Sequence, residues 1–229
     1  PHVAGVFVDG RYRVQVKSQV AMDHFTPVDW PETTPAAWLR EHLPDGGTVA
    51  FDPWLYTPDQ IAAIEKGLKD SAITLRASDN LIDAIWPDQP APPVGAVRIY
   101  PEDLAGETHH DKRRRLAAAL RNASHAAAVI TLPDSIAWLL NIRGSDIPRN
   151  PIPHAFAVLH DDAHLTLFVD AGKLSDDIRD HLGEEVTIRP PNAFGPGLRS
   201  LTGTVRVDHS SAPLWVLHQL DEAGVSHAK

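Results

Sequence analysis

Three short patterns occur twice along the chain in the same order, and this internal repeat limits the possible folds more than any other feature of the sequence. The matched pairs are Phe7-Val8-Asp9-Gly10 with Phe168-Val169-Asp170-Ala171, residues 47–52 with residues 203–208, and Pro58 with Pro213, each of these prolines opening an amphipathic helix. The copies lie 161, 156 and 155 residues apart, so their spacing is nearly constant. One such match is expected between any two strand-turn units of an α/β protein, whereas three collinear matches favour a duplicated domain with small insertions.

Helix and strand patterns alternate along both copies. Short β-branched or aromatic runs bounded by turn residues predict strands, and apolar residues at helical spacing predict helices. The predicted strands are residues 6–8, 48–51, 73–75, 127–130, 155–159, 165–169, 186–188 and 205–207, and the predicted helices are residues 35–43, 58–68, 112–121, 135–140, 174–182 and 213–223. Residues 12–20 fit a helix or a strand, and the Pro/Gly-rich residues 190–197 predict a loop. The class is therefore α/β, and the tight hairpin at residues 160–164 predicts a mixed sheet.

Residues 87–93 hold four prolines, the densest such stretch of the chain, and predict a linker between two domains. Residues 1–86 are expected to be the C-terminal part of a first domain, and residues 94–229 a second domain. With this boundary, Asp170 lies 76 residues into the second copy, whereas Asp9 has only eight residues before it. The repeat therefore predicts about 60–70 further residues of the first domain upstream of Pro1.

The charge balance excludes several classes of partner. With 21 Lys and Arg against 30 Asp and Glu, the net charge of −9 disfavours nucleic acid and anionic lipid as partners. The chain has no apolar run of about 18 residues and its first residues lack the layout of a signal peptide, so a soluble, cytoplasmic protein is expected. The absence of cysteine excludes disulfides, thiol catalysis and Cys-ligated zinc.

Two groups of His and Asp residues deserve consideration as metal ligands, because imidazole and carboxylate both suit zinc or manganese. They are His160, Asp161, Asp162 and His164 in one group and His109, His110 and Asp111 in the other. The first group falls in the predicted hairpin loop and has no further His or acidic residue near it in sequence. A polar turn is the favoured interpretation of both groups. No motif of a serine hydrolase, zinc protease or nucleotide-binding enzyme is present.

Two basic features remain. The run Lys112-Arg113-Arg114-Arg115 lies on a predicted helix of an acidic protein and predicts a solvated helix face. Arg11 follows the Asp-Gly turn at the end of a predicted strand, where α/β sheets present functional side chains. The second copy reads Asp170-Ala171-Gly172-Lys173 at this turn, so the Arg is particular to the first copy. The residues alone leave open whether Arg11 forms a surface salt bridge or pairs with a carboxylate or peptide carbonyl of a ligand.

The most distinctive stretch runs from Ser135 to Ile147 and is followed by Asn150-Pro151. Here the sequence resembles the aminopeptidase P (Xaa-Pro aminopeptidase) family in its three-domain form. The segments Phe7-Val8-Asp9-Gly10-Arg11-Tyr12, Phe51-Asp52-Pro53 and Asn80-Leu81-Ile82-Asp83-Ala84-Ile85-Trp86 are similar to that family's first domain. The resemblance implies two tandem creatinase N-terminal-like domains, each a mixed sheet flanked by helices, with the first domain incomplete.

The family resemblance also carries expectations about function. The family's chemistry resides in a third domain of the pita-bread fold, which holds two divalent metal ions, manganese or zinc, and has no counterpart in this chain. The chain is thus expected to be an inactive region of a cytoplasmic, homodimeric Xaa-Pro metallo-aminopeptidase, acting with its own catalytic domain on peptides with proline at the second position. Of the family's functional residues only Arg11 can be carried over, as a substrate-binding residue, and no catalytic or metal-binding residue can be assigned.

Two other functions remain open from the sequence. One is a stand-alone, non-catalytic creatinase-like binding module. The other is an unrelated α/β hydrolytic enzyme that uses the His160 and His164 loop.

Overall fold

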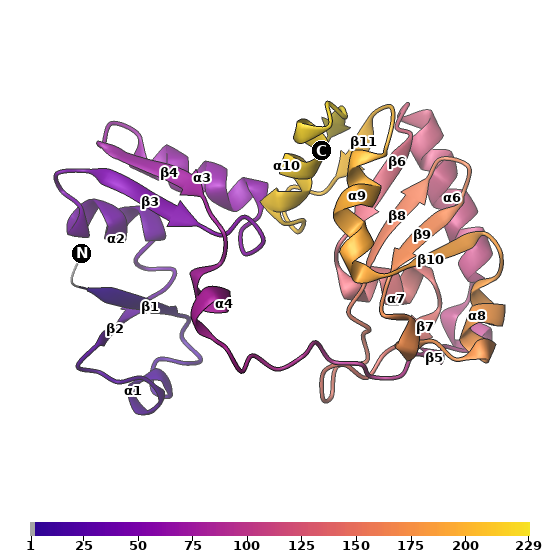
Figure 1. Cartoon of the computed structure of the whole chain (residues 1–229), viewed down its shortest axis with the longest axis horizontal. Coiled ribbons are helices and arrows are strands. Elements are labelled where there is room, and N and C mark those ends of the chain that lie inside the picture. The colour runs from indigo at the N-terminus through magenta and orange to yellow at the C-terminus, as the bar shows by residue number, and fades with distance from the viewer. Residues whose placement is uncertain (1–2) are drawn as a thin grey trace. The chain divides into compact units, whose positions relative to one another are not determined.

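A computed structural model describes residues 3–229, and contacts within the chain divide them into two units. The first unit extends to Pro53 and includes Asp59–Leu81, and the second comprises Trp54–Pro58 and Ile82–Lys229 (Figure 1). Each unit is described by itself below.

The first unit is built from strands that pair only in parallel. Its elements are β1 (Ala4–Val8), α1 (Val16–Gln19), β2 (Phe25–Asp29), α2 (Pro35–His42), β3 (Gly47–Phe51), α3 (Pro58–Leu68) and β4 (Ile73–Ala77). β1 pairs with β2 and β3 with β4, in two separate two-stranded sheets. Among the described residues of this unit, no strand pairs antiparallel to β1 or β3.

Helices α2 and α3 supply the small core of the first unit. Thr34 caps α2 by accepting a hydrogen bond from the N–H of Ala37 (3.2 Å), and Pro35 occupies the first helical turn, where a missing N–H costs nothing. Ala36, Leu68 and Ile73 are buried together between α2, α3 and β4. The sequence predicts both helices because cap, proline and apolar spacing all agree.

The second unit contains a six-stranded mixed sheet of order β10-β9-β8-β6-β11-β12. Its elements are α4 (Leu81–Ile85), β5 (Arg98–Ile99), α5 (Glu102–Ala105), α6 (His109–Asn122), β6 (Ala127–Ile130), α7 (Pro133–Leu139), β7 (Ile142–Arg143), β8 (Phe156–His160), β9 (Leu165–Phe168), α8 (Asp176–Leu182), β10 (Val186–Arg189), α9 (Phe194–Arg199), β11 (Val205–Val207), α10 (Leu214–Glu222) and β12 (His227–Ala228). β8 is antiparallel to both of its neighbours, and the other pairs of this sheet are parallel. The predicted hairpin between β8 and β9 and the predicted mixed sheet are confirmed in this unit.

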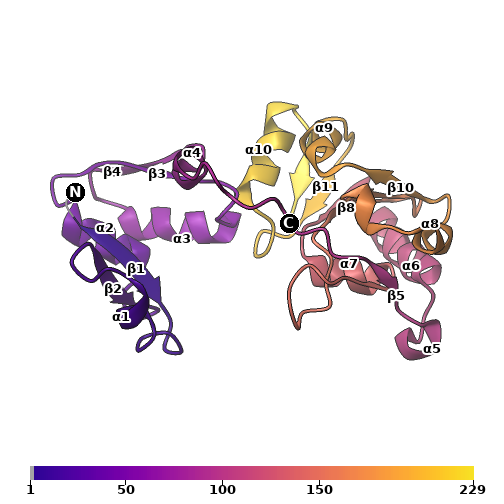
Figure 2. The ribbon, with the colours of Figure 1, turned by 60° about the horizontal axis from the view of Figure 1, so that its bottom comes forward.

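Helices cover both faces of this sheet (Figure 2). One core packs α6, α7 and α8 against the sheet, around residues such as Leu120, Ile136 and Ile178. The other core packs α9 and α10 against the opposite face, around Phe194 and Leu220. The predicted loop at residues 190–197 is wrong in its second half, because α9 begins at Phe194.

The two units repeat the same turn chemistry. After β1, Oδ1 of Asp9 accepts a hydrogen bond from the N–H of Arg11 (2.9 Å), and after β9, Oδ1 of Asp170 accepts one from the N–H of Gly172 (2.8 Å). β1–β2 and β9–β10 are both parallel pairs, as are β3–β4 and β11–β12. The internal repeat seen in the sequence is therefore also a repeat of strand pairing and of an aspartate turn.

Candidate functional site

Arg11 lies in the turn after β1, and Asp9 holds its side chain as well as its backbone. Nη2 of Arg11 donates to Oδ2 of Asp9 (2.6 Å), and Nε contacts both carboxylate oxygens at 3.2–3.3 Å. The hydrogen bond from Arg11 holds the pKa of Asp9 below its usual value, and the carboxylate raises the pKa of Arg11. The Arg11 side chain is nevertheless 82% exposed. The turn thus presents a guanidinium that is oriented by Asp9 and still accessible to a ligand.

A second arginine joins this turn to the end of β2. Because β1 and β2 are parallel, their carboxyl ends meet at one edge. Nη2 of Arg13 donates to Oε2 of Glu32 (2.5 Å), and Nε lies 3.3 Å from Oδ1 of Asp29. Tyr12 and Trp30, in the same two turns, are each 48% exposed. This edge of the first unit therefore combines exposed aromatic rings with fixed cations.

The sequence gives no signal for the contacts of Arg13. Asp29 and Glu32 lie 16 and 19 residues further along the chain, and only the pairing of β1 with β2 brings them to Arg13. The strand β2 itself was not predicted, since Pro27 interrupts its short apolar run.

The basic run on α6 is not a solvated face, and this prediction is wrong. Lys112 and Arg113 are each only 1% exposed. A helix of 3.6 residues per turn places Arg113 on the same side as Leu116 and Leu120, which face the core. Arg115 fits the prediction, since it lies at the surface and pairs with Glu107 (2.8 Å).

Lys112 fixes the turn after α7. Its Nζ donates to the backbone oxygen of Trp138 (2.9 Å) and to Oδ1 of Asn141 (2.7 Å), and lies 4.4 Å from the centre of the Trp138 ring. Asn141 has a positive φ of 50° and donates from Nδ2 to the backbone oxygen of Glu107 (2.9 Å). Burial lowers the pKa of Lys112. The turn at Asn141, directly after α7, is therefore stabilised by a buried lysine.

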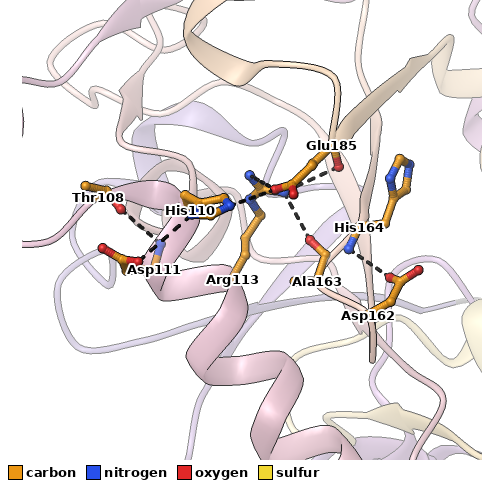
Figure 3. Close-up of polar contacts among 8 residues, drawn as sticks. All are labelled: Thr108, His110, Asp111, Arg113, Asp162, Ala163, His164 and Glu185. Carbon is orange, nitrogen blue, oxygen red and sulfur yellow. Dashed lines mark hydrogen bonds and ion pairs between the residues drawn. The ribbon is translucent and has the colours of Figure 1, made fainter.

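Arg113 connects α6 to two loops of the sheet (Figure 3). Nη1 donates to the backbone oxygen of Ala163 (3.0 Å) in the β8–β9 turn, and Nη2 donates to Oε2 of Glu185 (3.2 Å) before β10. His110 approaches the same Oε2 with its Nε2 at 3.1 Å. Burial lowers the pKa of Arg113, and Glu185 opposes this shift. His110, Arg113 and Glu185 therefore connect α6, the β8–β9 turn and the loop before β10.

The candidate metal-binding histidines have other contacts. The N–H of His164 donates to Oδ1 of Asp162 (2.9 Å), and the His164 ring bonds to Oγ1 of Thr187 (2.8 Å). The rings of His109 and His181 lie 4.6 Å apart. Within residues 3–229, no group of three or more His, Asp or Glu side chains is placed to hold a metal ion. The described residues therefore do not fit a metal centre.

A cavity of about 490 Å³ opens where β6 and β11 end. Its lining is apolar at Leu132 and Trp138, with Arg206 and Asp208 at the β11 side. Crevices at the carboxyl ends of parallel strands are where open α/β sheets bind ligands. The sequence did not predict this cavity, since its walls come from four separate segments.

Two models of the Creatinase/Prolidase N-terminal domain match the chain, one over residues 3–85 and the other over residues 88–229. Proteins described as probable Xaa-Pro aminopeptidase P from Aspergillus niger and Aspergillus flavus are 33% and 35% identical to it, over 213 and 205 residues. These alignments cover 91% and 88% of this chain but 34% and 31% of the relatives. The chain thus spans about one third of the length of these relatives.

The fold also matches a crystal structure of X-prolyl aminopeptidase from Caenorhabditis elegans, described as a cytosolic enzyme with a di-nuclear active site. The TM-score is 0.86 at 27% identity, over 99% of this chain and 39% of that chain. Family models, relatives and structure all agree with the aminopeptidase P resemblance of the sequence. The chain therefore belongs to the Creatinase/Prolidase N-terminal domain family, with two such domains in tandem.

Proposed function

We propose that the chain is the non-catalytic N-terminal region of a metallo-aminopeptidase that removes the N-terminal residue preceding proline. The observation that carries this proposal is the match to the C. elegans X-prolyl aminopeptidase, in which nearly all of this chain aligns with well under half of that enzyme. The Aspergillus relatives are likewise about three times as long as the part matched here. The remaining length of the parent leaves room for a catalytic domain of its own.

The metal ions of the parent, two manganese or zinc ions, belong in this proposal to that catalytic domain. Two observations support the assignment: the neighbouring enzyme is described as having a di-nuclear active site, and residues 3–229 offer no group of ligands that fits one. No step of the hydrolysis is assigned to the side chains of this chain.

Arg11 is the residue of this chain proposed to contact substrate, a peptide with proline at its second position. Its support is geometric. The guanidinium is exposed, oriented by Asp9 and located at the carboxyl ends of β1 and β2. The N–H groups of a guanidinium can donate to a peptide carboxylate or carbonyl. Such a ligand would bind the Arg11 guanidinium at the same time as Asp9.

The two domains, with limits proposed at residues 1–86 and 94–229 around the linker 87–93, would restrict access to the catalytic cleft and take part in a homodimer. A cytoplasmic location agrees with the description of the C. elegans neighbour as cytosolic. No helix within residues 3–229 combines the length and apolar character of a membrane span. The net charge of −9 supports peptides rather than nucleic acids as ligands.

The test compares this chain with the protein encoded by the whole reading frame, both purified and assayed on an Xaa-Pro-Pro peptide with manganese. The proposal expects turnover by the longer protein and none above buffer by the 229-residue chain. Turnover by the chain alone, proportional to its concentration and removed by chelator, would contradict a non-catalytic role. A reading frame that encodes no further domain would favour the stand-alone binding module instead.

A further inference from the structure

The cavity at the ends of β6 and β11 lies where the chain leaves the sheet toward opposite faces. β6 and β11 are adjacent parallel strands, so both end at the same edge. The chain continues from β6 into α7, whose Ile136 is buried in the core on one face, and from β11 into α10, whose Val216 is buried in the core on the other face. Open α/β sheets bind ligands in the crevice that such a divergence creates.

The cavity has the volume and the apolar walls of a small-molecule site. Its volume of about 490 Å³ lies within the range of about 300–1,000 Å³ that is usual for such sites. The core under α6 and α7 ends at the partly buried Ala128 and Ile130 of β6, and both residues line the cavity. Leu132 and Trp138 line it as well and are 41% and 45% exposed. The cavity thus presents apolar surface that a ligand can cover.

Two side chains of opposite charge line the cavity from the β11 side. Val205 and Val207 are buried in the core with α9 and α10, so Arg206 projects to the other face, toward α6 and α7. Asp208 follows directly after the strand, and Arg206 and Asp208 are both exposed residues of the cavity lining. Within residues 3–229, no hydrogen bond or ion pair engages the Arg206 guanidinium. This cation is therefore available to an anionic group in the cavity.

Turn hydrogen bonds hold the Asp208 carboxylate in place. Its Oδ1 accepts from the N–H of Ser210 (2.9 Å) and from Oγ of Ser210 (2.7 Å), and its Oδ2 accepts from Oγ of Ser211 (2.6 Å). The hydrogen bonds from Ser211 and Ser210 hold the pKa of Asp208 below its usual value, so the carboxylate is ionised at neutral pH. Since Oδ2 accepts only one of these bonds, it keeps a lone pair for a cationic group.

We propose that this cavity binds a free amino acid with a large apolar side chain, whose carboxylate pairs with Arg206 and whose ammonium group pairs with Asp208. The apolar side chain of the ligand lies against Leu132 and Trp138. The source of the ligand rests on the proposed function, because an aminopeptidase releases a free amino acid in every turnover. The cavity would then bind a product of the parent's own reaction.

The spacing of the two charges favours a free amino acid over a peptide. Arg206 and Asp208 lie two residues apart in extended chain, which is about 7 Å along the backbone. The two charged groups of an amino acid share one Cα and fit between these side chains, whereas each additional residue separates the termini of a peptide by about 3.6 Å more. A fatty acid would leave the Asp208 carboxylate facing an apolar chain, and a sugar would leave Leu132 and Trp138 without an apolar partner.

Calorimetric titration of the 229-residue chain with three ligands tests each contact. The ligands are L-leucine, leucine amide, which lacks the carboxylate, and 4-methylpentanoate, which lacks the ammonium group. Leucine is expected to bind at millimolar concentration near neutral pH. Each of the other two is expected to bind about tenfold more weakly, because one charge-assisted contact is lost.

Variants of the two charged residues assign each contact to its partner. Arg206→Gln and Asp208→Asn are each expected to weaken leucine binding about tenfold. Arg206→Gln should not weaken the binding of leucine amide further, and Asp208→Asn should not weaken that of 4-methylpentanoate, since these ligands lack the group concerned. Arg114→Gln and Asp180→Asn, at exposed positions outside the cavity, are the matched controls and should bind leucine as the wild type does.

The outcomes separate this site from the proposed function. No binding at millimolar leucine, or equal binding by the wild type and both cavity variants, would overturn the site and leave the proposed function intact. Binding of leucine by the 229-residue chain but not by the longer parent would show that other parts of the parent cover the cavity and would also overturn it. A parent that binds leucine but cleaves no Xaa-Pro-Pro peptide would overturn the proposed function and leave the site.

Discussion

The ammonium group of Lys112 lies 4.4 Å from the centre of the Trp138 ring and donates a hydrogen bond to the backbone oxygen of that same residue. A second bond, to Asn141, ties the end of α7 to the turn that follows it. Trp138 is also a wall of the cavity at the ends of β6 and β11. A buried cation therefore holds one side of a surface-accessible cavity in place.

Replacing Lys112 with alanine should destabilise the second unit strongly. The substitution leaves the buried acceptors on Trp138 and Asn141 without their donor and removes the side chain that fills the space under the ring. We expect a loss of about 2–4 kcal/mol in the free energy of unfolding, measured by urea denaturation. Arg114→Ala, an exposed position of the same basic run, is the control and should change stability by no more than about 0.5 kcal/mol. Equal effects of the two substitutions would contradict the buried role of Lys112.

The buried pair Asp146 and Lys173 should control stability in acid. Oδ2 of Asp146 lies 2.8 Å from Nζ of Lys173, and the two side chains are 0% and 4% exposed. Burial by itself raises the pKa of Asp146, but hydrogen bonds from Lys173 and from the N–H groups of His154 and Gly95 outweigh it and hold the pKa below its usual value. A lowered pKa stabilises the folded state above about pH 4, the ordinary value of an aspartate, and this contribution disappears as the pH falls further.

Asp146→Asn should therefore cost about 3 kcal/mol near neutral pH, and the difference from the wild type should shrink as the pH falls below about 4. Urea denaturation at a series of pH values measures both quantities. Asp180→Asn, at an exposed position of α8, is the control. A difference that stays constant down to pH 2 would exclude Asp146 as the titrating group.

His109 should make the stability of the fold depend on pH in a higher pH range than Asp146 does. Burial, together with the nearby His181 and Arg113, lowers the pKa of His109 to about 4. As the pH falls from about 6.5 to 4, the unfolded chain binds a proton that the folded chain does not, so stability falls in this window. His109→Phe keeps a ring against His181 and should flatten the stability profile between these pH values. His24→Phe, at an exposed histidine, should leave the profile unchanged, and a profile unaffected by either substitution would contradict the prediction.

The sequence predicts β6 and β11 well, because β6 is a short apolar run and β11 is a β-branched pair of buried valines that flank an exposed arginine, each between polar turns. It fails at α9, where Gly195, Pro196 and Gly197 are typical of a loop. A tertiary contact requires glycine there, since a Cβ on Gly197 would lie 2.7 Å from the ring of Phe168. Local propensity cannot reveal a contact with a strand nearly thirty residues earlier.

In the candidate site, too, some contacts can be predicted from the sequence and others cannot. The ion pair between Asp9 and Arg11 was open to prediction because its partners lie two residues apart within one turn. The contacts of Arg13 depend on strand register, and the burial of Lys112 depends on which face of α6 meets the core, so neither follows from the run of charges. The role of Arg11 toward a peptide substrate stays a prediction.

That role can be measured with Arg11→Lys in the longer protein that the proposed function requires. Lysine keeps the charge but loses the planar fork, so we expect kcat/KM on an Xaa-Pro-Pro peptide to fall about tenfold. The melting temperature should not change, because the Arg11 side chain is 82% exposed. Arg76→Lys, at an exposed arginine of β4, is the matched control and should keep wild-type kinetics. A rise in KM with unchanged kcat would assign Arg11 to substrate binding, whereas wild-type kinetics for Arg11→Lys would leave its pairing with Asp9 as a surface salt bridge and remove it from the site.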